Sequence, residues 1–276
     1  MRQRISAIVV FVSTSPSELR ALIGAGTGSE RAYADALLRM AWAQSNDAKE
    51  RRELLGVLAE LREASGQSHA RVRTRIASGE LARAELRSTF EAVPALERDH
   101  FVEEVLGIAY PPLDEGAPGT DLMSYAPSGY DEIVYAFEQS GLGASHRFLD
   151  LGAGLGKVVM LAELLTGAAS VGVEYDSQLC ELGRDACREL GLQNVSLRVQ
   201  DARELDSVDA DVVFMYLPFS GEVLGAVMAR LLATPARPRY FCTGALELQR
   251  YPELSPVGSP QSWLNVYARR ASTQSV

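Results

Sequence analysis

The sequence predicts an α/β fold in which helices cover both faces of a mostly parallel β-sheet, with a helical amino-terminal domain in front of it. From residue 147 onward, short apolar runs alternate with helical patterns, and a glycine-rich turn joins the first run to a helix. From residue 15 to residue 110, the apolar residues recur at helical spacing. The chain has 276 residues, of which 47% are apolar, so it can bury a large core.

The amino-terminal region begins with a short apolar segment and continues as helices. Residues 5–12 are apolar and follow Arg2 and Arg4, which predicts a buried strand or helix end; an export signal is the alternative. The i, i+3, i+4 spacing and a capped start then predict helices. One helix is predicted to begin at residues 15–18. Further helices are predicted around residues 34–41, 54–61, 68–89 and 94–107.

A segment rich in proline and glycine, residues 110–119, cannot continue a helix. We therefore predict two domains: a helical amino-terminal domain with its linker at 1–120, and a ligand-binding domain at 121–276. In the second domain the strands are predicted at residues 147–151, 170–174, 195–199, 211–217, 238–243 and 263–269. The helices are predicted at residues 131–140, 155–166, 177–190 and 221–233.

The turn at 152–156 alternates glycine with other residues directly after Asp150. Glycine lets backbone N–H groups approach a ligand, and the helix that follows adds the positive end of its dipole. Glu174 closes the next strand, where a carboxylate can accept both hydroxyls of a ribose. A dinucleotide site has the spacing G-x-G-x-x-G, whereas this turn reads G-x-G-x-G. Because Asp150 would repel phosphate and attract a cation, the pattern fits S-adenosylmethionine.

These residues resemble the first motif of the class I S-adenosylmethionine-dependent methyltransferases, and the resemblance extends from Tyr125 to Arg270. It implies a Rossmann-like sheet whose last strand, at 263–269, is antiparallel. It also implies that Asp150 and the turn at 152–156 contact the methionine part of the cofactor, and that Glu174 holds the ribose. Asp201 matches the acid near the adenine amino group. The cofactor-binding residues that we predict on this basis are Tyr125, Asp150, Gly152, Gly154, Gly156, Glu174, Tyr175, Asp201, Ala202 and Tyr216.

A narrower resemblance spans residues 125–174. Tyr125-Ala126-Pro127-Ser128 before a helix, followed by the glycine turn and Gly-Val-Glu, is similar to the non-SET protein-lysine methyltransferases related to the disruptor-of-telomeric-silencing enzymes. That resemblance implies a loop that closes over the cofactor and aromatic residues that line a channel for lysine. The helical amino-terminal region shows no such resemblance.

The acceptor site is predicted at the end of the fourth strand, where Tyr216-Leu217-Pro218-Phe219 follows the apolar run. Many amine methyltransferases read (N/D)-P-P-(Y/F) here, and this chain matches only the last two positions. Tyr216 and Tyr125 are the catalytic candidates, as residues that line the channel; Tyr130 is a further channel candidate or a core aromatic. We expect methyl transfer to a protein lysine. The alternatives are a small-molecule N- or O-methyltransferase of specialised metabolism and a non-catalytic cofactor-binding scaffold.

Charge and composition narrow the partners. Lys and Arg balance Asp and Glu at 15 and 15 over residues 1–110, but the counts are 12 and 21 over residues 111–276. This acidic half predicts a cationic acceptor and no nucleic-acid partner. The scattered His residues and Cys180, Cys187 and Cys242 predict no metal site. Apart from the apolar segment at 5–12, no run approaches membrane-spanning length, so we expect a cytoplasmic protein without membrane contact.

Overall fold

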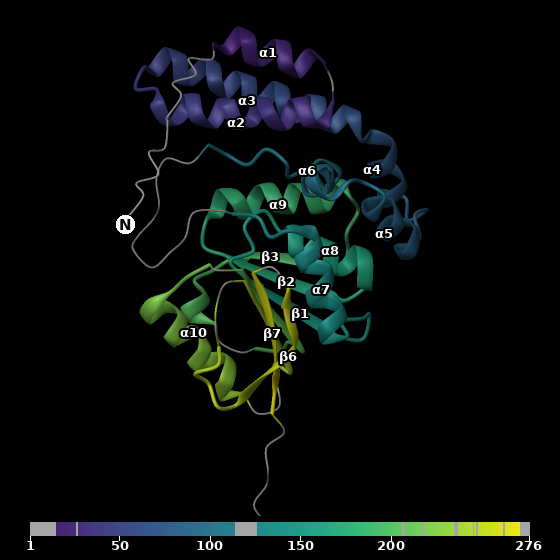
Figure 1. Ribbon diagram of the computed structural model, residues 1–276, viewed down its shortest axis with the longest axis vertical. Coiled ribbons are helices and arrows are strands. Elements are labelled where there is room, and N and C mark those ends of the chain that lie inside the picture. Colours follow the sequence, from purple (N-terminus) through teal and green to yellow (C-terminus); the bar gives the residue numbers. More distant parts are fainter. Residues whose placement is uncertain are drawn as a thin grey trace, which may run out of the picture. The chain divides into compact units, whose positions relative to one another are not determined.

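The computed structural model describes residues 15–25, 27–113, 126–205, 208–216, 218–234, 237–244, 246, 248–261 and 263–270 (Figure 1). The chain divides into two compact units, Met1–Gln67 and Ser68–Val276. The apolar segment at 5–12 and the predicted domain boundary at 120/121 lie outside the described residues. The division of the chain at that boundary therefore stays a prediction.

The first unit contains helices α1 (Pro16–Ala25), α2 (Gly28–Gln44) and most of α3 (Ala48–Ser68). Helix α2 begins with a capping box, in which the Thr27 hydroxyl accepts from the Glu30 N–H and the Glu30 carboxylate accepts from the Thr27 N–H. The helical spacing predicted here is confirmed, because its apolar positions form the buried side of the helices. The fully buried leucines of this unit are Leu19, Leu38, Leu54 and Leu61.

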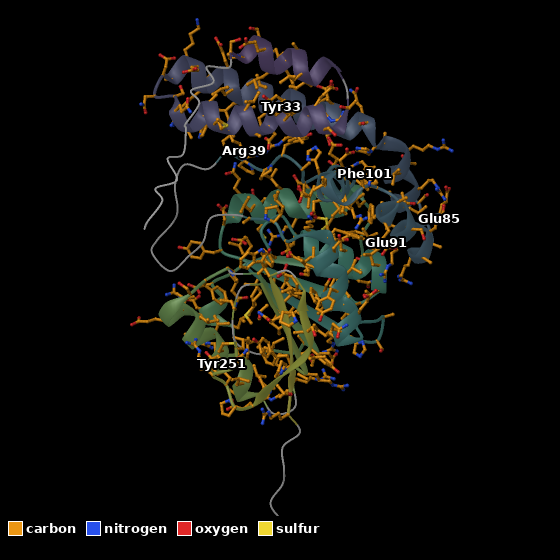
Figure 2. All side chains as sticks on the ribbon, in the orientation of Figure 1. Tyr33, Arg39, Glu85, Glu91, Phe101 and Tyr251 are labelled. Carbon is orange, nitrogen blue, oxygen red and sulfur yellow. The ribbon has the colours of Figure 1, made fainter. Side chains whose placement is uncertain are left out.

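The second unit begins with helices α4 (Ala70–Ala77), α5 (Arg83–Glu91) and α6 (Ala95–Leu106). The helical pattern predicted over 68–89 forms two helices, because Gly79 adopts a left-handed conformation at φ 70° after the end of α4. Helix α6 confirms the prediction at 94–107. Its Phe101 ring meets the Phe90 ring of α5 edge to face, with ring centres 6.2 Å apart. Figure 2 labels Phe101.

Helices α4 to α6 share one buried cluster with the sheet. This cluster includes Phe90 of α5, Val102 and Leu106 of α6, and Phe148 of the first strand. Helix α7 (Tyr130–Ser140) contributes Ile133 and Phe137 to the same cluster. By packing, these helices therefore belong with the sheet, although they precede the predicted domain boundary.

The sheet has seven strands in the order β3-β2-β1-β4-β5-β7-β6. The first five are parallel, whereas β7 pairs antiparallel with both β5 and β6. This order confirms the Rossmann-like prediction and the antiparallel last strand. The strands are β1 (Arg147–Leu151), β2 (Ala169–Glu174), β3 (Val195–Val199), β4 (Val212–Tyr216), β5 (Tyr240–Gly244), β6 (Leu254–Gln261) and β7 (Leu264–Arg269).

Strand β6 was not among the predicted strands because it contains Pro256 and Gly258. Proline lacks an N–H for a sheet ladder and normally argues against a strand. Here β6 is the edge strand, where one side of the backbone needs no partner in the sheet. The Tyr135 hydroxyl of α7 donates to the Ser259 carbonyl of β6 at 2.5 Å, and this bond joins the edge strand to α7.

Helices cover both faces of the sheet, as predicted (Figure 1). Helices α7, α8 (Lys157–Thr166) and α9 (Ser177–Glu189) pack on one face, and α10 (Gly221–Ala233) packs on the other. Strand β4 alternates accordingly, with Val212 and Phe214 in the first core and Val213 and Met215 in the second. The carboxyl ends of β1, β2 and β4 consequently meet at one edge of the sheet, where ligands of such folds bind.

Candidate active site

The turn after β1 has the backbone geometry that its glycines allow. Gly152, Gly154 and Gly156 have φ angles of 81°, 53° and 83°, which residues with a Cβ rarely adopt. The N–H groups of Gly152 and Ala153 donate to the Val173 carbonyl at 2.8 and 3.0 Å, which ties the turn to β2. A Cβ on Gly152 would lie 2.3 Å from the Cβ of Pro218. The turn therefore packs closely against the segment that follows β4.

Glu174, the last residue of β2, holds this turn through its carboxylate. Its Oε2 accepts from the Gly154 N–H at 2.7 Å, and its Oε1 accepts from the Asp176 N–H at 2.9 Å. Each carboxylate oxygen has a second lone pair, so these bonds leave acceptor capacity for a ligand. That Glu174 binds a ribose stays a prediction, as does the role of the neighbouring Tyr175, whose side chain is exposed.

Asp150 lies at the base of the turn and is only 2% exposed. Burial, followed by the negative charge of Glu174, raises the pKa of Asp150 well above its usual value. A bound cation favours the ionised form of such a carboxyl group, whereas a bound anion opposes it. The glycine turn and Asp150 together fit a cationic nucleoside ligand such as S-adenosylmethionine, with Gly152, Gly154 and Gly156 as the cradle.

Asp201 lies after β3, at the start of a short 3-10 helix, Ala202–Glu204. Its carboxylate accepts from the Arg203 backbone N–H at 2.8 Å and forms an ion pair with the Arg203 guanidinium. The hydrogen bond from the Arg203 side chain lowers the pKa of Asp201. An adenine amino group would therefore share this carboxylate with Arg203. The predicted adenine contacts of Asp201 and Ala202 stay predictions.

Tyr216 closes β4 at the same edge of the sheet, and its ring lies against the backbone of β5. It pairs with Gly244, where a Cβ would lie 2.1 Å from Cδ2 of the tyrosine ring. Burial, the charge of Glu132 and a hydrogen bond with the Glu132 side chain raise the pKa of Tyr216 to about 12. At neutral pH the hydroxyl therefore stays protonated.

Acidic side chains that the sequence analysis did not select surround this position. Glu132, in the first turn of α7, accepts from the Gly129 N–H at 3.2 Å as well as contacting Tyr216. Asp99 of α6 also contributes negative charge at Tyr216. The residues come from three elements that are distant in the sequence. In the sequence, the one pattern that could have pointed to these acids is the i, i+4 spacing of Asp99 and Glu103. Such spacing is common on solvated helix faces.

The remaining acceptor candidates divide into two groups. Tyr130 is a core aromatic, because it is 1% exposed and meets the Phe90 ring edge to face with centres 5.6 Å apart. Its proposed place in a channel is therefore wrong. Tyr125 lies outside the described residues, as does Leu217, so the channel role of Tyr125 stays a prediction. Phe219 is buried in the core on the α10 side.

Over the described part of the chain, no group of three or more His, Cys, Asp or Glu residues is placed to hold a metal ion. Cys180, Cys187 and Cys242 are free thiols in the core. Among the described helices, none has the length and apolar character needed to cross a membrane.

Residues 122–197 match the family model described as histone methylation protein DOT1. None of the curated proteins compared with the chain matches it. The matched segment includes α7, the glycine turn and Glu174, and it ends within β3. It does not include α6 or β4.

Solved structures with a similar fold cover about half of this chain. An RNA methyltransferase from Salinibacter ruber, in complex with S-adenosyl-L-homocysteine, is 23% identical, with 51% of this chain and 91% of that chain covered at a TM-score of 0.45. Magnesium protoporphyrin IX methyltransferase from Synechocystis PCC 6803, with bound SAM, is 13% identical, with 51% and 77% covered at a TM-score of 0.41. Ribosomal protein L11 methylase from Lactobacillus delbrueckii subsp. bulgaricus is 10% identical, with 51% and 77% covered at a TM-score of 0.42.

Proposed function

We propose that this class I S-adenosylmethionine-dependent methyltransferase transfers its methyl group to the side-chain amine of a protein lysine. The enzyme class and the cofactor rest on the order of the sheet, the glycine turn with Asp150, and the match of residues 122–197 to the DOT1 family. The acceptor is our proposal. The observation that carries it is the Glu132–Tyr216 pair at the carboxyl end of β4.

The charges near Tyr216 favour a cationic acceptor. Glu132 and Asp99 both place negative charge near the tyrosine, and this charge helps to raise its pKa. Opposite charge draws an ammonium group toward such a site, and the ring of Tyr216 adds a surface that cations favour. A neutral hydroxyl acceptor would gain none of this charge attraction. The site therefore supports an amine better than an alcohol.

The chemistry requires an amine that has lost its proton. When bound, S-adenosylmethionine supplies an activated methyl group on sulfur, which passes to the nitrogen while the C–S bond breaks and the sulfur keeps the electron pair. Alignment of the amine by Tyr216 and Glu132 can contribute through effective concentration, which is worth up to about 7–11 kcal/mol. Tyr216 stays protonated at neutral pH because burial and Glu132 raise its pKa to about 12, so it donates a hydrogen bond and is no base.

Glu132 is the group in this pair that can accept the proton leaving the ammonium. A carboxylate within hydrogen-bond reach of the nitrogen can act as a base or pass the proton to water. The Gly129 N–H donates to Glu132 Oε2 at 3.2 Å, which holds this side chain at the start of α7. Its Gln variant keeps the shape and removes the charge.

The direct test is to identify the methylated product. The protein is incubated with S-adenosylmethionine carrying a labelled methyl group and with a cell extract separated into protein, RNA and small-molecule fractions. We expect label in the protein fraction, released as N-methyllysine by acid hydrolysis, and lost in the Glu132→Gln variant. Glu222→Gln, an exposed change in the first turn of α10, serves as the matched control.

Other outcomes would replace this proposal. Label in the small-molecule fraction would favour the alternative of N- or O-methylation in specialised metabolism. Label in the RNA fraction would also overturn the expectation that no nucleic acid is bound, which stays a prediction. A protein that binds S-adenosylmethionine but transfers no label to any fraction would favour the scaffold alternative. A cytoplasmic location belongs to the same proposal and is tested by fractionation of cells.

A further inference from the structure

Lys157 occupies an unfavourable position for a cation. It is the first residue of α8, directly after Gly156, and its side chain is 4% exposed. The amino terminus of a helix carries the positive end of the dipole, and burial removes the water around the ammonium. Lys49 and Lys157 are the only lysines among the 27 Lys and Arg residues. At this position the chain therefore has a compact ammonium group, whereas almost all of its other basic residues are arginines.

Two carboxylates of α6 compensate this charge. The Lys157 Nζ lies 2.8 Å from Asp99 Oδ1 and 2.7 Å from Glu103 Oε1. Asp99 and Glu103 are one helical turn apart, so they lie on the same face of α6. The side chain of Glu103 is 13% exposed, whereas that of Asp99 is 51% exposed. Since two acids share one ammonium, the loss of either charge leaves Lys157 paired with the other.

Asp99 also holds the start of α7. The same Oδ1 atom accepts from the Tyr130 backbone N–H at 2.6 Å, at the first residue of that helix. A carboxylate is favourable at a helix amino terminus. Through Asp99, helix α6 therefore contacts the first residue of two other helices. These are Lys157 of α8, directly after the glycine turn, and Tyr130 of α7. The match to the DOT1 family begins at residue 122, so α6 lies outside it.

We propose that Asp99 and Glu103 are positioning residues of the cofactor site, which act through Lys157 on the end of the glycine turn. Asp99 also fixes the entry of the chain into α7 through the Tyr130 N–H. Neither acid touches the cofactor in this proposal. The inference rests on the proposed use of the turn at 152–156 to bind S-adenosylmethionine, and it adds α6 to the elements that determine the affinity.

Calorimetric titration of the full chain with S-adenosylmethionine tests the proposal. Glu103→Gln and Asp99→Asn keep the shape of each side chain and remove one charge. We expect each to raise the dissociation constant at least about fivefold, because the turn is less firmly held. Glu97→Gln, an exposed change on the same helix, serves as the control and should leave the constant unchanged. Unchanged binding in Glu103→Gln and Asp99→Asn would overturn the proposal.

A background without the ammonium separates this role from a general effect of charge. In Lys157→Met, the Glu103→Gln change should weaken binding no further, because the acid acts only through Lys157. If Glu103→Gln weakened binding equally in both backgrounds, the two residues would act independently and the proposal would be wrong.

Amide hydrogen exchange of the ligand-free chain gives a second readout that needs no cofactor. Residues 152–157 should exchange faster in Glu103→Gln than in Glu97→Gln, while the amides of β4 stay equally protected. Faster exchange throughout the sheet would indicate a loss of overall stability and would contradict a positioning role. If the unmutated chain does not bind S-adenosylmethionine, the proposed function fails, and exchange at 152–157 still decides this inference.

Discussion

The two sides of the proposed active site are built in different ways. On the proposed cofactor side, backbone groups of the turn at 152–156 and the carboxylate of Glu174 come from two neighbouring strands and the loops that follow them. On the acceptor side, Asp99, Glu132 and Tyr216 come from α6, α7 and β4. The first side depends on backbone geometry and the second on side chains that meet only in the folded protein.

This difference separates two kinds of functional information. A turn that needs left-handed backbone angles restricts the sequence to glycine at each such position, so the pattern is visible in the chain itself. A cluster of acids requires only that each side chain reach a common point, and this requirement leaves no local pattern. The cofactor side should therefore be sensitive to small changes in backbone as well as to charge, whereas the acceptor side should be sensitive mainly to changes of charge.

The largest effect is expected from Gly152→Ala. The residue has a φ angle of 81°, and a Cβ would lie 2.3 Å from the Cβ of Pro218. We expect the free energy of unfolding to fall by about 2–4 kcal/mol and the affinity for S-adenosylmethionine to be lost. Urea unfolding and calorimetric titration measure the two effects.

Gly225→Ala provides the control for this change. Gly225 lies inside α10 with no atom near its Cβ position, so alanine should stabilise the helix by about 0.5–1 kcal/mol. Equal stability of the two variants would show that the close packing of Gly152 against Pro218 does not matter in solution.

A smaller effect, confined to cofactor affinity, is expected from Glu174→Ala. The variant loses two predicted hydrogen bonds to the ribose, each worth about 1.5–3 kcal/mol, so binding should weaken at least about tenfold. It also loses the acceptor for the Gly154 N–H. Calorimetry decides the prediction, and an unchanged dissociation constant for S-adenosylmethionine would remove the ribose role.

Tyr216→Ala should affect the reaction more than cofactor binding. If the tyrosine aligns the acceptor, the rate of methyl transfer should fall by about tenfold or more while the affinity for S-adenosylmethionine stays near normal. The rival view is that Tyr216 is a core aromatic, since its ring stacks with that of Phe214 at a centre distance of 6.4 Å. In that case rate and melting temperature should fall together. Normal values of both would contradict both views.

The sequence predicted much of the local structure on the proposed cofactor side and little of the arrangement on the proposed acceptor side. The alternation of strands and helices, the turn at 152–156 and the place of Glu174 were correct because each follows from local chain geometry. The acids near Tyr216 were missed because Asp99 and Glu132 lie on helices whose charged residues resemble ordinary solvated faces. Strand β6 was missed because Pro256 normally argues against a strand and only the edge position permits it.

A further prediction concerns pH. Burial and Glu174 raise the pKa of Asp150, so the folded protein holds a proton there that the unfolded chain has lost above the ordinary carboxyl range. The folded state then binds more protons than the unfolded state, and stability falls as pH rises, by at most about 1.4 kcal/mol per pH unit from this group. Asp150→Asn removes this dependence. Above the ordinary carboxyl range, the unfolding free energy of Asp150→Asn should rise with pH relative to that of the unmutated protein. A difference that does not change with pH would contradict the raised pKa of Asp150.

The measurement that tests the division of the crevice most directly is a comparison of cofactor affinity with single-turnover methyl transfer in Glu132→Gln. Glu132 contacts Tyr216 and the Gly129 N–H. We predict a dissociation constant for S-adenosylmethionine within about twofold of the unmutated value and a rate that is lower by about a hundredfold, since a positioned carboxylate typically contributes this much to proton transfer. A normal rate, or a loss of rate fully explained by weaker cofactor binding, would contradict the assignment of Glu132 and Tyr216 to the acceptor side.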